Sequence, residues 1–151
     1  MQKIIDLRKH VPFVKKHKAL LSLGSNIEPR MNYLKHAKEL IEKNIGIILK
    51  SSSILDNPAE IYLEQPNFLN QIIEIETFLT PIKLLSVIKK IEKEIGRKER
   101  FRYGPREIDI DILFYEKQKF VTNELMIPHP AVSERKYLKI LLKEFDLKDY
   151  E

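Results

Sequence analysis

The feature that most limits how this chain can fold is the alternation of residue types between Glu107 and Tyr115. Successive side chains of a β-strand point to opposite faces, so a period of two predicts a strand with one buried face. The apolar positions are Ile108, Ile110, Ile112 and Phe114, and the positions between them are Glu107, Asp109, Asp111 and Leu113. The stretch is therefore predicted to be a strand whose second face is mostly acidic.

Two aspartates of this strand, Asp109 and Asp111, point the same way. Residues two apart on a strand are separated by roughly 6.5–7 Å, so two carboxylates can converge on one divalent cation or hold a pair. A solvated face is the more common meaning of Asp-x-Asp by itself. However, four arginines lie between Arg97 and Arg106. Carboxylates and guanidiniums at this density favour a place where metal and phosphate bind together.

Composition narrows the class of protein. A length of 151 residues predicts one domain, and a composition of 43% hydrophobic and 32% charged residues is typical of a globular chain that can bury a core. The chain has no cysteine, which excludes disulfides and thiolate metal sites and leaves hard cations. The net charge of +5 suits an anionic ligand. No signal peptide or membrane-spanning run is evident, so we expect a cytoplasmic protein.

The N-terminal segment, residues 1–17, is rich in lysine, and Pro12 interrupts any helix there. We predict that it is an extension and that residues 18–151 form the domain. Because every motif lies beyond Lys18, removing the extension is expected to leave activity intact.

The rest of the chain alternates between strand and helix signals. Further strands are predicted at Lys18–Leu23, Ile47–Leu55 and Phe68–Thr77, with a long loop at Asp56–Pro66. A helix is predicted over Pro29–Asn44, burying Met31, Leu34, Ala37 and Ile41. A second helix is expected to begin after Thr80 as N-cap, with Pro81 in its first turn, and to end at Gly96. A hairpin or edge segment at Tyr115–Val121, a break at Pro128-His129-Pro130 and a last helix over Tyr137–Phe145 complete the chain.

This order, β-α-β-β-α-β, predicts an α+β fold of the ferredoxin-like type, in which helices cover an antiparallel sheet, with an extra C-terminal hairpin and helix. The fold serves many activities and names none of them. An RNA-binding module would need aromatic residues on an open sheet face, whereas this chain offers Asp109 and Asp111 there. A regulatory domain without catalytic activity is a second alternative, and the acid and arginine set disfavours it.

Several motifs occur together in one order, and they carry a resemblance that spans about Ala19 to Phe145. They are Leu23-Gly24-Ser25-Asn26, Gln65-Pro66-Asn67-Phe68-Leu69-Asn70, Ile91-Glu92, Gly96-Arg97, Arg102 to Asp111 and Pro128-His129-Pro130. The chain resembles the hydroxymethyldihydropterin pyrophosphokinases of folate biosynthesis. The resemblance implies transfer of the terminal diphosphate of ATP to 6-hydroxymethyl-7,8-dihydropterin, with release of AMP.

The resemblance also implies roles for individual residues. Asp109 and Asp111 would hold two Mg²⁺ ions, and Arg97 and Arg106 would neutralise the transferring phosphates. The residues implied for ATP are Glu92, Arg102, His129 and Arg135. Those implied for the pterin are Asn57, Phe68, Asn70 and Tyr137, with Phe68 and Tyr137 sandwiching the ring.

The chain departs from the family pattern at Tyr103, where a tryptophan is common, and at Glu99, where a basic residue is usual. Small molecules are the expected partners, namely ATP and the pterin. We expect a monomer that binds neither nucleic acid nor membrane.

Overall fold

The structure is a computed structural model that describes residues 15–151, so most of the predicted extension, residues 1–14, lies outside the described residues. The strands are β1 (His17–Ser25), β2 (Gly46–Ser51), β3 (Leu55–Asn57), β4 (Phe68–Thr77), β5 (Asp109–Tyr115), β6 (Phe120–Val121) and β7 (Met126–Ile127). The helices are α2 (Arg30–Asn44), α3 (Pro81–Ile95), α4 (Ala131–Glu134) and α5 (Lys136–Leu142), followed by a 3-10 turn at Leu147–Asp149.

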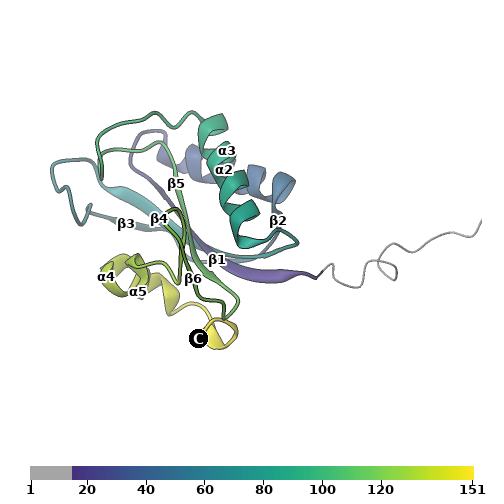
Figure 1. The fold of residues 1–151 in the computed structure, drawn as a ribbon. Coiled ribbons are helices and arrows are strands. Elements are labelled where there is room, and N and C mark those ends of the chain that lie inside the picture. The colour runs from purple at the N-terminus through teal and green to yellow at the C-terminus, as the bar shows by residue number, and fades with distance from the viewer. Residues whose placement is uncertain (1–14) are drawn as a thin grey trace, which may run out of the picture.

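The main sheet has the strand order β2-β4-β1-β5, and each neighbouring pair is antiparallel. Strand β3 also pairs with β4, beyond the end of β2. Helices α2 and α3 lie on one side of the sheet, and α4 and α5 lie on the other (Figure 1). The prediction of an antiparallel sheet covered by helices is therefore confirmed.

The central strand β1 is buried on both faces, which creates two hydrophobic cores. Leu21 and Leu23 pack in the core under α2 and α3, whereas Leu20 packs in the core under α5. Strand β4 does the same: Ile73 and Ile75 face the first core and Ile72 faces the second. Burial on both faces explains why β4 does not show a simple alternation of apolar and polar residues.

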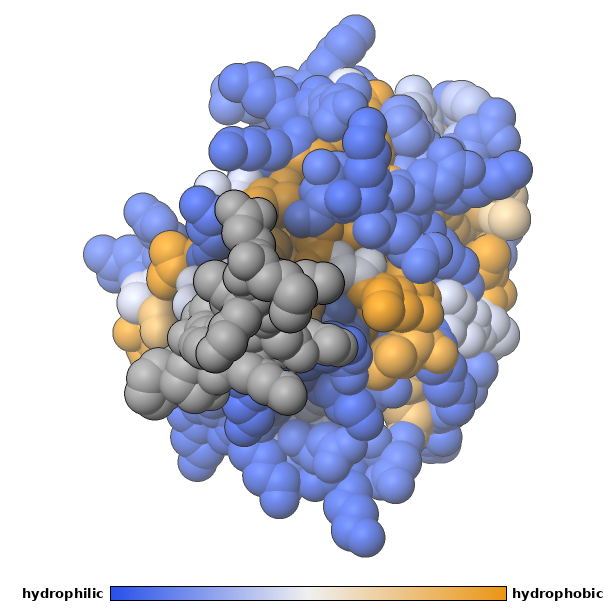
Figure 2. Space-filling model, turned by 90° about the vertical axis from the view of Figure 1, so that its right-hand side faces the viewer, coloured by the Kyte–Doolittle hydropathy of each residue, from blue (hydrophilic) through white to orange (hydrophobic). Residues whose placement is uncertain are grey.

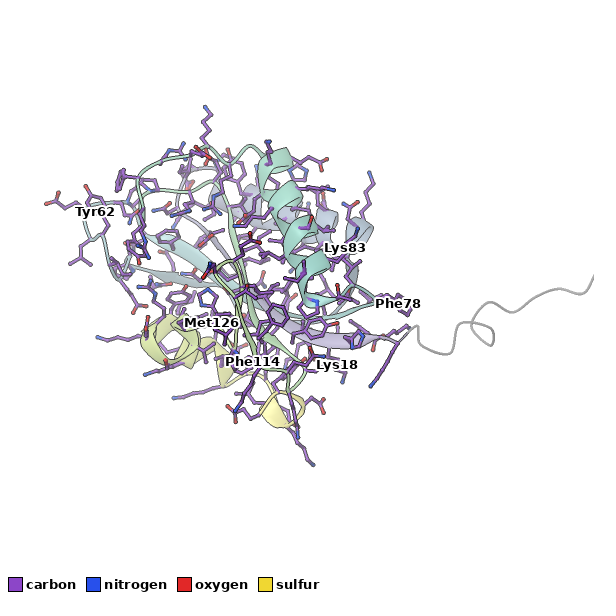
Figure 3. The ribbon with its side chains drawn as sticks, viewed as in Figure 1. Lys18, Tyr62, Phe78, Lys83, Phe114 and Met126 are labelled. Atoms are coloured by element: carbon purple, nitrogen blue, oxygen red, sulfur yellow. The ribbon has the colours of Figure 1, made fainter. Side chains whose placement is uncertain are left out.

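A β-bulge in β5 makes the prediction for Phe114 wrong. Leu21 lies opposite Ile112 and Leu20 lies opposite Phe114, which leaves Leu113 as an extra residue on β5. The alternation shifts there, so Phe114 joins Leu20 in the core under α5 (Figure 3). Asp109 and Asp111 precede the bulge and keep the predicted face.

The predicted strand Ile47–Leu55 is wrong in its extent, because the chain leaves the sheet between β2 and β3. Ser52 marks the break. Its Oγ accepts a hydrogen bond from the Ile72 N–H at 2.9 Å, and its own N–H donates to the Ile72 carbonyl at 2.8 Å. The predicted loop consequently begins later, since Asp56 and Asn57 belong to β3.

Helix α3 has the predicted boundaries. The Thr80 hydroxyl accepts a hydrogen bond from the Lys83 N–H at 3.4 Å, Pro81 opens the helix, and Gly96 ends it with a φ of 109°. In α2, the predicted burial of Met31 is wrong: the residue is 54% exposed, and Leu40 is buried instead. Met31 lies in the first turn of α2, beyond the edge of the core.

Figure 2 shows hydrophilic residues over most of the face at which β1 begins, with hydrophobic residues exposed between them. Phe78 and Ile82, at the turn into α3, are among the exposed apolar residues of the protein. Within residues 15–151, none of the helices has the length and apolar character needed to cross a bilayer.

Candidate active site

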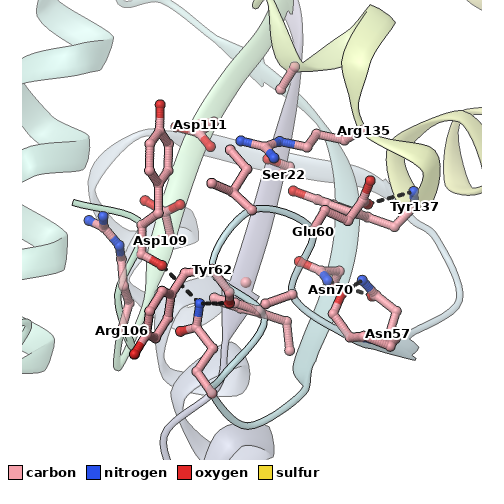
Figure 4. A pocket seen from close by; sticks show the side chains of 18 of the residues that line it. Ser22, Asn57, Glu60, Tyr62, Asn70, Arg106, Asp109, Asp111, Arg135 and Tyr137 are labelled. Carbon is pink, nitrogen blue, oxygen red and sulfur yellow. Dashed lines mark hydrogen bonds between the residues drawn. The ribbon is translucent and has the colours of Figure 1, made fainter. Parts of the chain in front are cut away.

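A cavity of about 260 Å³ opens beside the N-terminal half of β5, between the sheet, the loop 58–67 that joins β3 to β4, and α5 (Figure 4). Nine of the twelve predicted site residues line it: Asn57, Phe68, Asn70, Arg106, Asp109, Asp111, His129, Arg135 and Tyr137. They come from three strands, two loops and the helix region at the C-terminus. Glu92, Arg97 and Arg102 do not line the cavity.

Asp109 and Asp111 both face the cavity, as the strand period predicts. Their neighbours on β1 are small: Asp109 lies opposite Gly24, and Asp111 lies opposite Ser22. A Cβ at Gly24 would lie 2.8 Å from Asn70 Oδ1, so only glycine lets the Asn70 amide come this close. Small residues beside the carboxylates leave room for a ligand over the sheet.

Glu92 supports the acidic face from behind. Its side chain is 5% exposed, and its Oε2 accepts hydrogen bonds from Arg97 Nη1 at 2.6 Å and from the Ile110 N–H at 2.9 Å. The same Arg97 nitrogen donates to Asp109 Oδ1 at 3.0 Å. Burial raises the pKa of Glu92, although the Arg97 charge opposes that change. Glu92 thus does not contact the cavity itself but orients Arg97, which in turn is hydrogen-bonded to Asp109 in the cavity wall.

The electrostatics of this face disfavour negative charge unless cations are near. Burial, and then the charges of Asp109 and Glu92, raise the pKa of Asp111 well above its usual value. His129 faces Asp111, with 3.7 Å between His129 Nε2 and Asp111 Oδ1, which is too long for a hydrogen bond. Its Nδ1 accepts from the Ala131 N–H at 3.0 Å, so the neutral ring carries its proton on Nε2. Burial lowers the pKa of His129.

The donor set fits a hard cation that is shared with a ligand. Within residues 15–151, no group of three or more His, Cys, Asp or Glu side chains is arranged to hold a metal. Two adjacent carboxylates suit Mg²⁺, which prefers oxygen, retains waters and commonly shares phosphate oxygens with a substrate. Asp109 and Asp111 are therefore a fitting but incomplete ligand set.

The other end of the cavity combines amides with aromatic rings. Asn70 Nδ2 donates to Asn57 Oδ1 at 2.7 Å, and Asn57 Nδ2 donates to the Pro58 carbonyl at 3.1 Å. Asn70 keeps its own Oδ1 and a second N–H for a ligand. Phe68 and Tyr137 also line the cavity. Burial raises the pKa of Tyr137 further above neutral pH, so its hydroxyl stays protonated over the whole range in which the protein would work.

Two residues that the sequence reasoning left without a role hold the loops around the cavity. Asn26 Nδ2 donates to Gln65 Oε1 at 2.8 Å, while Asn26 Oδ1 accepts from the Arg106 N–H at 2.8 Å. Gln65 Nε2 in turn donates to the Tyr103 carbonyl at 2.8 Å. Asn26 belongs to the motif Leu23-Gly24-Ser25-Asn26 and Gln65 opens the motif Gln65-Pro66-Asn67-Phe68-Leu69-Asn70, and membership of these motifs is the only sequence feature that marks the two residues. They tie loop 58–67 to the arginine-rich loop 97–106.

Glu107 does not share the acidic face of Asp109 and Asp111, contrary to the prediction. It precedes β5 and is 5% exposed, and its carboxylate accepts from Arg100 Nη1 at 2.7 Å and from Arg100 Nη2 at 2.8 Å. The hydrogen bonds from Arg100 lower the pKa of Glu107 to about 2. Arg102 stacks on the Tyr103 ring with 4.8 Å between its guanidinium carbon and the ring centroid. Its predicted contact with ATP stays a prediction.

The chain matches a family model described as 7,8-dihydro-6-hydroxymethylpterin-pyrophosphokinase (HPPK) over residues 20–146. It is 44% identical over 126 residues to the 2-amino-4-hydroxy-6-hydroxymethyldihydropteridine pyrophosphokinase of Aquifex aeolicus (strain VF5), covering 83% of this chain and 78% of that protein. The protein of the same name from Bacillus subtilis (strain 168) is 39% identical over 127 residues, covering 83% and 76%.

Among solved structures, the HPPK-DHPS protein of Plasmodium falciparum with pteroate has a TM-score of 0.70 at 18% identity. The match covers 85% of this chain but only 38% of that one, so it supports the likeness of the fold alone. Membership of the family is shown by the bacterial relatives and by the family model, and the residues that the family model matches, 20–146, include all of the predicted site residues that line the cavity. This chain therefore belongs to the 7,8-dihydro-6-hydroxymethylpterin-pyrophosphokinase family.

Proposed function

We propose that this chain transfers the terminal diphosphate of ATP to the hydroxymethyl group of 6-hydroxymethyl-7,8-dihydropterin, as a step of folate biosynthesis. Membership of the family supports the reaction. The observation that carries it is the lining of one cavity, which combines the Asp109 and Asp111 carboxylates with the Asn70 amide and the Phe68 and Tyr137 rings. A cavity of this kind suits a charged phosphate chain at one end and a flat polar heterocycle at the other.

In the proposed reaction, the hydroxyl oxygen of the pterin attacks the β-phosphorus of ATP. The bond from the β-phosphorus to the oxygen that bridges it to the α-phosphorus breaks, and AMP leaves with that oxygen. Such transfer depends on positioning and charge stabilisation more than on covalent help from the protein. No nucleophilic side chain is needed.

The Asp109 and Asp111 carboxylates would hold two Mg²⁺ ions. Bound there, the ions would neutralise phosphate charge and lower the pKa of the pterin hydroxyl. The raised pKa of Asp111 supports this role, because burial first, and then the charges of Asp109 and Glu92, disfavour its ionised form unless a cation binds beside it.

Arginines would complement the phosphates. Arg106 and Arg135 line the cavity, and neither side chain has an ion-pair partner within residues 15–151. We propose that both contact ATP, together with His129. Arg97 is already bonded to Glu92 and Asp109, so it would act at the edge of the phosphate site with its orientation fixed. Bidentate guanidinium groups suit phosphate oxygens.

The pterin would lie between the Phe68 and Tyr137 rings, with Asn70 reading its polar edge. Asn57 supports that amide through the 2.7 Å hydrogen bond. Stacking on each ring contributes on the order of 1 kcal/mol beyond burial.

The strand order β2-β4-β1-β5 further supports the proposal that the fold is of the ferredoxin-like type. The β6–β7 pair would be the extra hairpin, although it lies at Phe120–Ile127 and not at the expected Tyr115–Val121. The proposed partners are two small molecules, and the proposed working state is a monomer in the cytoplasm.

A coupled assay of AMP release tests the function. The purified protein, ATP, Mg²⁺ and 6-hydroxymethyl-7,8-dihydropterin should give AMP and the pterin diphosphate, and omission of either the pterin or Mg²⁺ should abolish it. Pterin-independent release of ADP instead of AMP would refute diphosphate transfer. Calorimetry with a non-hydrolysable ATP analogue separates the enzyme from the RNA-binding alternative, since only the enzyme requires Mg²⁺ for tight nucleotide binding.

A further inference from the structure

Glu60, which lies in loop 58–67 and lines the cavity, has both carboxylate oxygens engaged with the backbone of α5. Its Oε1 accepts from the Lys136 N–H at 3.0 Å, and its Oε2 accepts from the Tyr137 N–H at 3.3 Å. These are the first two residues of the helix. The contact joins segments that are 76 residues apart in the chain.

Helix α5 has no cap of its own. The first N–H groups of any α-helix lack partners within the helix, and an N-cap side chain usually supplies one. In α5 the N-cap position is Arg135, whose side chain makes no capping hydrogen bond. Glu60 provides the missing acceptors from another segment. Because α5 is only seven residues long, the order of its first turn depends strongly on them.

The first turn of α5 carries Tyr137, and loop 58–67 follows directly on Asn57. Loop 58–67 is held at its start by the Asn70–Asn57 hydrogen bond and near its end by Gln65. Between these two points, Glu60 joins the loop to α5, the helix that carries Tyr137. Figure 4 shows Glu60 beside Tyr137, with Asn57 and Asn70 along the same wall.

We propose that Glu60 is a positioning residue for the pterin end of the cavity. It fixes the first turn of α5 against loop 58–67 and thereby sets the distance between the Tyr137 ring and the opposite wall. This role rests on the proposed function. The Glu60 carboxylate acts through backbone groups and makes no contact with Asp109 or Arg106 at the phosphate end. Among the residues proposed to contact ATP, only Arg135, the N-cap residue of α5, adjoins the turn that Glu60 holds.

The proposal predicts separate effects on the two ligands. In Glu60→Ala, the amides of Lys136 and Tyr137 lose their acceptors, and the loss of one cap corresponds to about a fivefold change in an equilibrium. The Kd for 6-hydroxymethylpterin should therefore rise about fivefold. The Kd for a non-hydrolysable ATP analogue with Mg²⁺ should change by a clearly smaller factor, because Arg135 is the only one of its proposed contacts that adjoins the first turn of α5. Glu60→Gln keeps one acceptor and should give an intermediate value.

The test is calorimetry with each ligand, together with amide hydrogen exchange of the free full-length protein followed by NMR. Exchange of the Lys136 and Tyr137 amides should accelerate in Glu60→Ala. Glu64→Ala is the matched control, because Glu64 is an exposed acid of the same loop and makes no hydrogen bond or ion pair within residues 15–151. It should leave both Kd values and both amides unchanged.

Equal weakening of pterin and nucleotide would overturn the proposal, as would an unchanged pterin Kd in Glu60→Ala. Unchanged exchange at the two amides would show that the capping contact is not formed in solution. If the wild-type protein bound no pterin, the proposed function itself would fail, and the amide exchange would still report on the contact between Glu60 and α5. The two failures are thus distinguishable.

Discussion

Replacing Glu107 with glutamine is expected to destabilise the protein at neutral pH by about 2 kcal/mol. The hydrogen bonds from Arg100 lower the Glu107 pKa from 4.5 to about 2. That difference, at about 1.36 kcal/mol for each pH unit, corresponds to about 3 kcal/mol of stability. Solvent reaches 29% of the Arg100 side chain, and its screening reduces the expected value to about 2 kcal/mol.

The pH dependence has a definite sign. Because the pKa of Glu107 is lower in the folded protein than in the unfolded chain, its contribution is fully present above pH 4.5 and is lost as the pH falls toward 2. Urea denaturation should therefore show the difference between wild type and Glu107→Gln shrinking over that range. At pH 7 the variant should melt about 4–8 °C lower.

Glu124→Gln, a change at an exposed acid in the turn before β7, serves as the control and should leave stability unchanged. A loss below about 0.5 kcal/mol for Glu107→Gln, or a loss that does not vary between pH 2 and 4.5, would refute the reasoning. Either result would mean that the Arg100–Glu107 pair does not hold loop 97–106 in solution.

Three further substitutions test the fold, the loops and the acidic face. In Gly46→Ala the new Cβ would meet the Glu76 carbonyl oxygen at 2.0 Å, so a loss of about 3 kcal/mol in the free energy of unfolding is expected in urea denaturation. Asn26→Ala leaves the Arg106 N–H without its acceptor, and hydrogen exchange in loops 58–67 and 97–106 should accelerate together; a change confined to one loop would contradict their coupling. Asp111→Asn should lower turnover in the AMP assay at least about a hundredfold. It should also raise the metal-free melting temperature, since it removes a charge that burial and Asp109 disfavour, and a lowered melting temperature would instead make Asp111 structural.

The parts of the fold that could be predicted are those governed by local rules. Helix α3 has its N-cap at Thr80, a proline in its first turn and a glycine at its end, and each signal acts within a few residues. Strand β4 has the predicted bounds, Phe68–Thr77. The prediction that Asp109 and Asp111 share one face of β5 is confirmed, because the two-residue period of the strand holds up to the bulge at Leu113. The predicted face of Phe114 is wrong because the bulge arises from the pairing of β5 with β1, and the periodicity within β5 carries no information about that pairing.

The site required more than local rules because most of its order comes from contacts between distant segments. Glu60 could not be distinguished from Glu64 by sequence, since its partners are the backbone N–H groups of Lys136 and Tyr137, and every residue except proline carries such a group. Glu107 is a second example. The two-residue period predicts that it shares the face of Asp109, but it lies before the first residue of β5 and forms an ion pair with Arg100 instead. Acidic side chains therefore have two different roles: Glu60 and Glu107 hold loops in place, whereas Asp109 and Asp111 face the cavity. Which role each one takes depends on the cation or backbone N–H group that the fold places beside it.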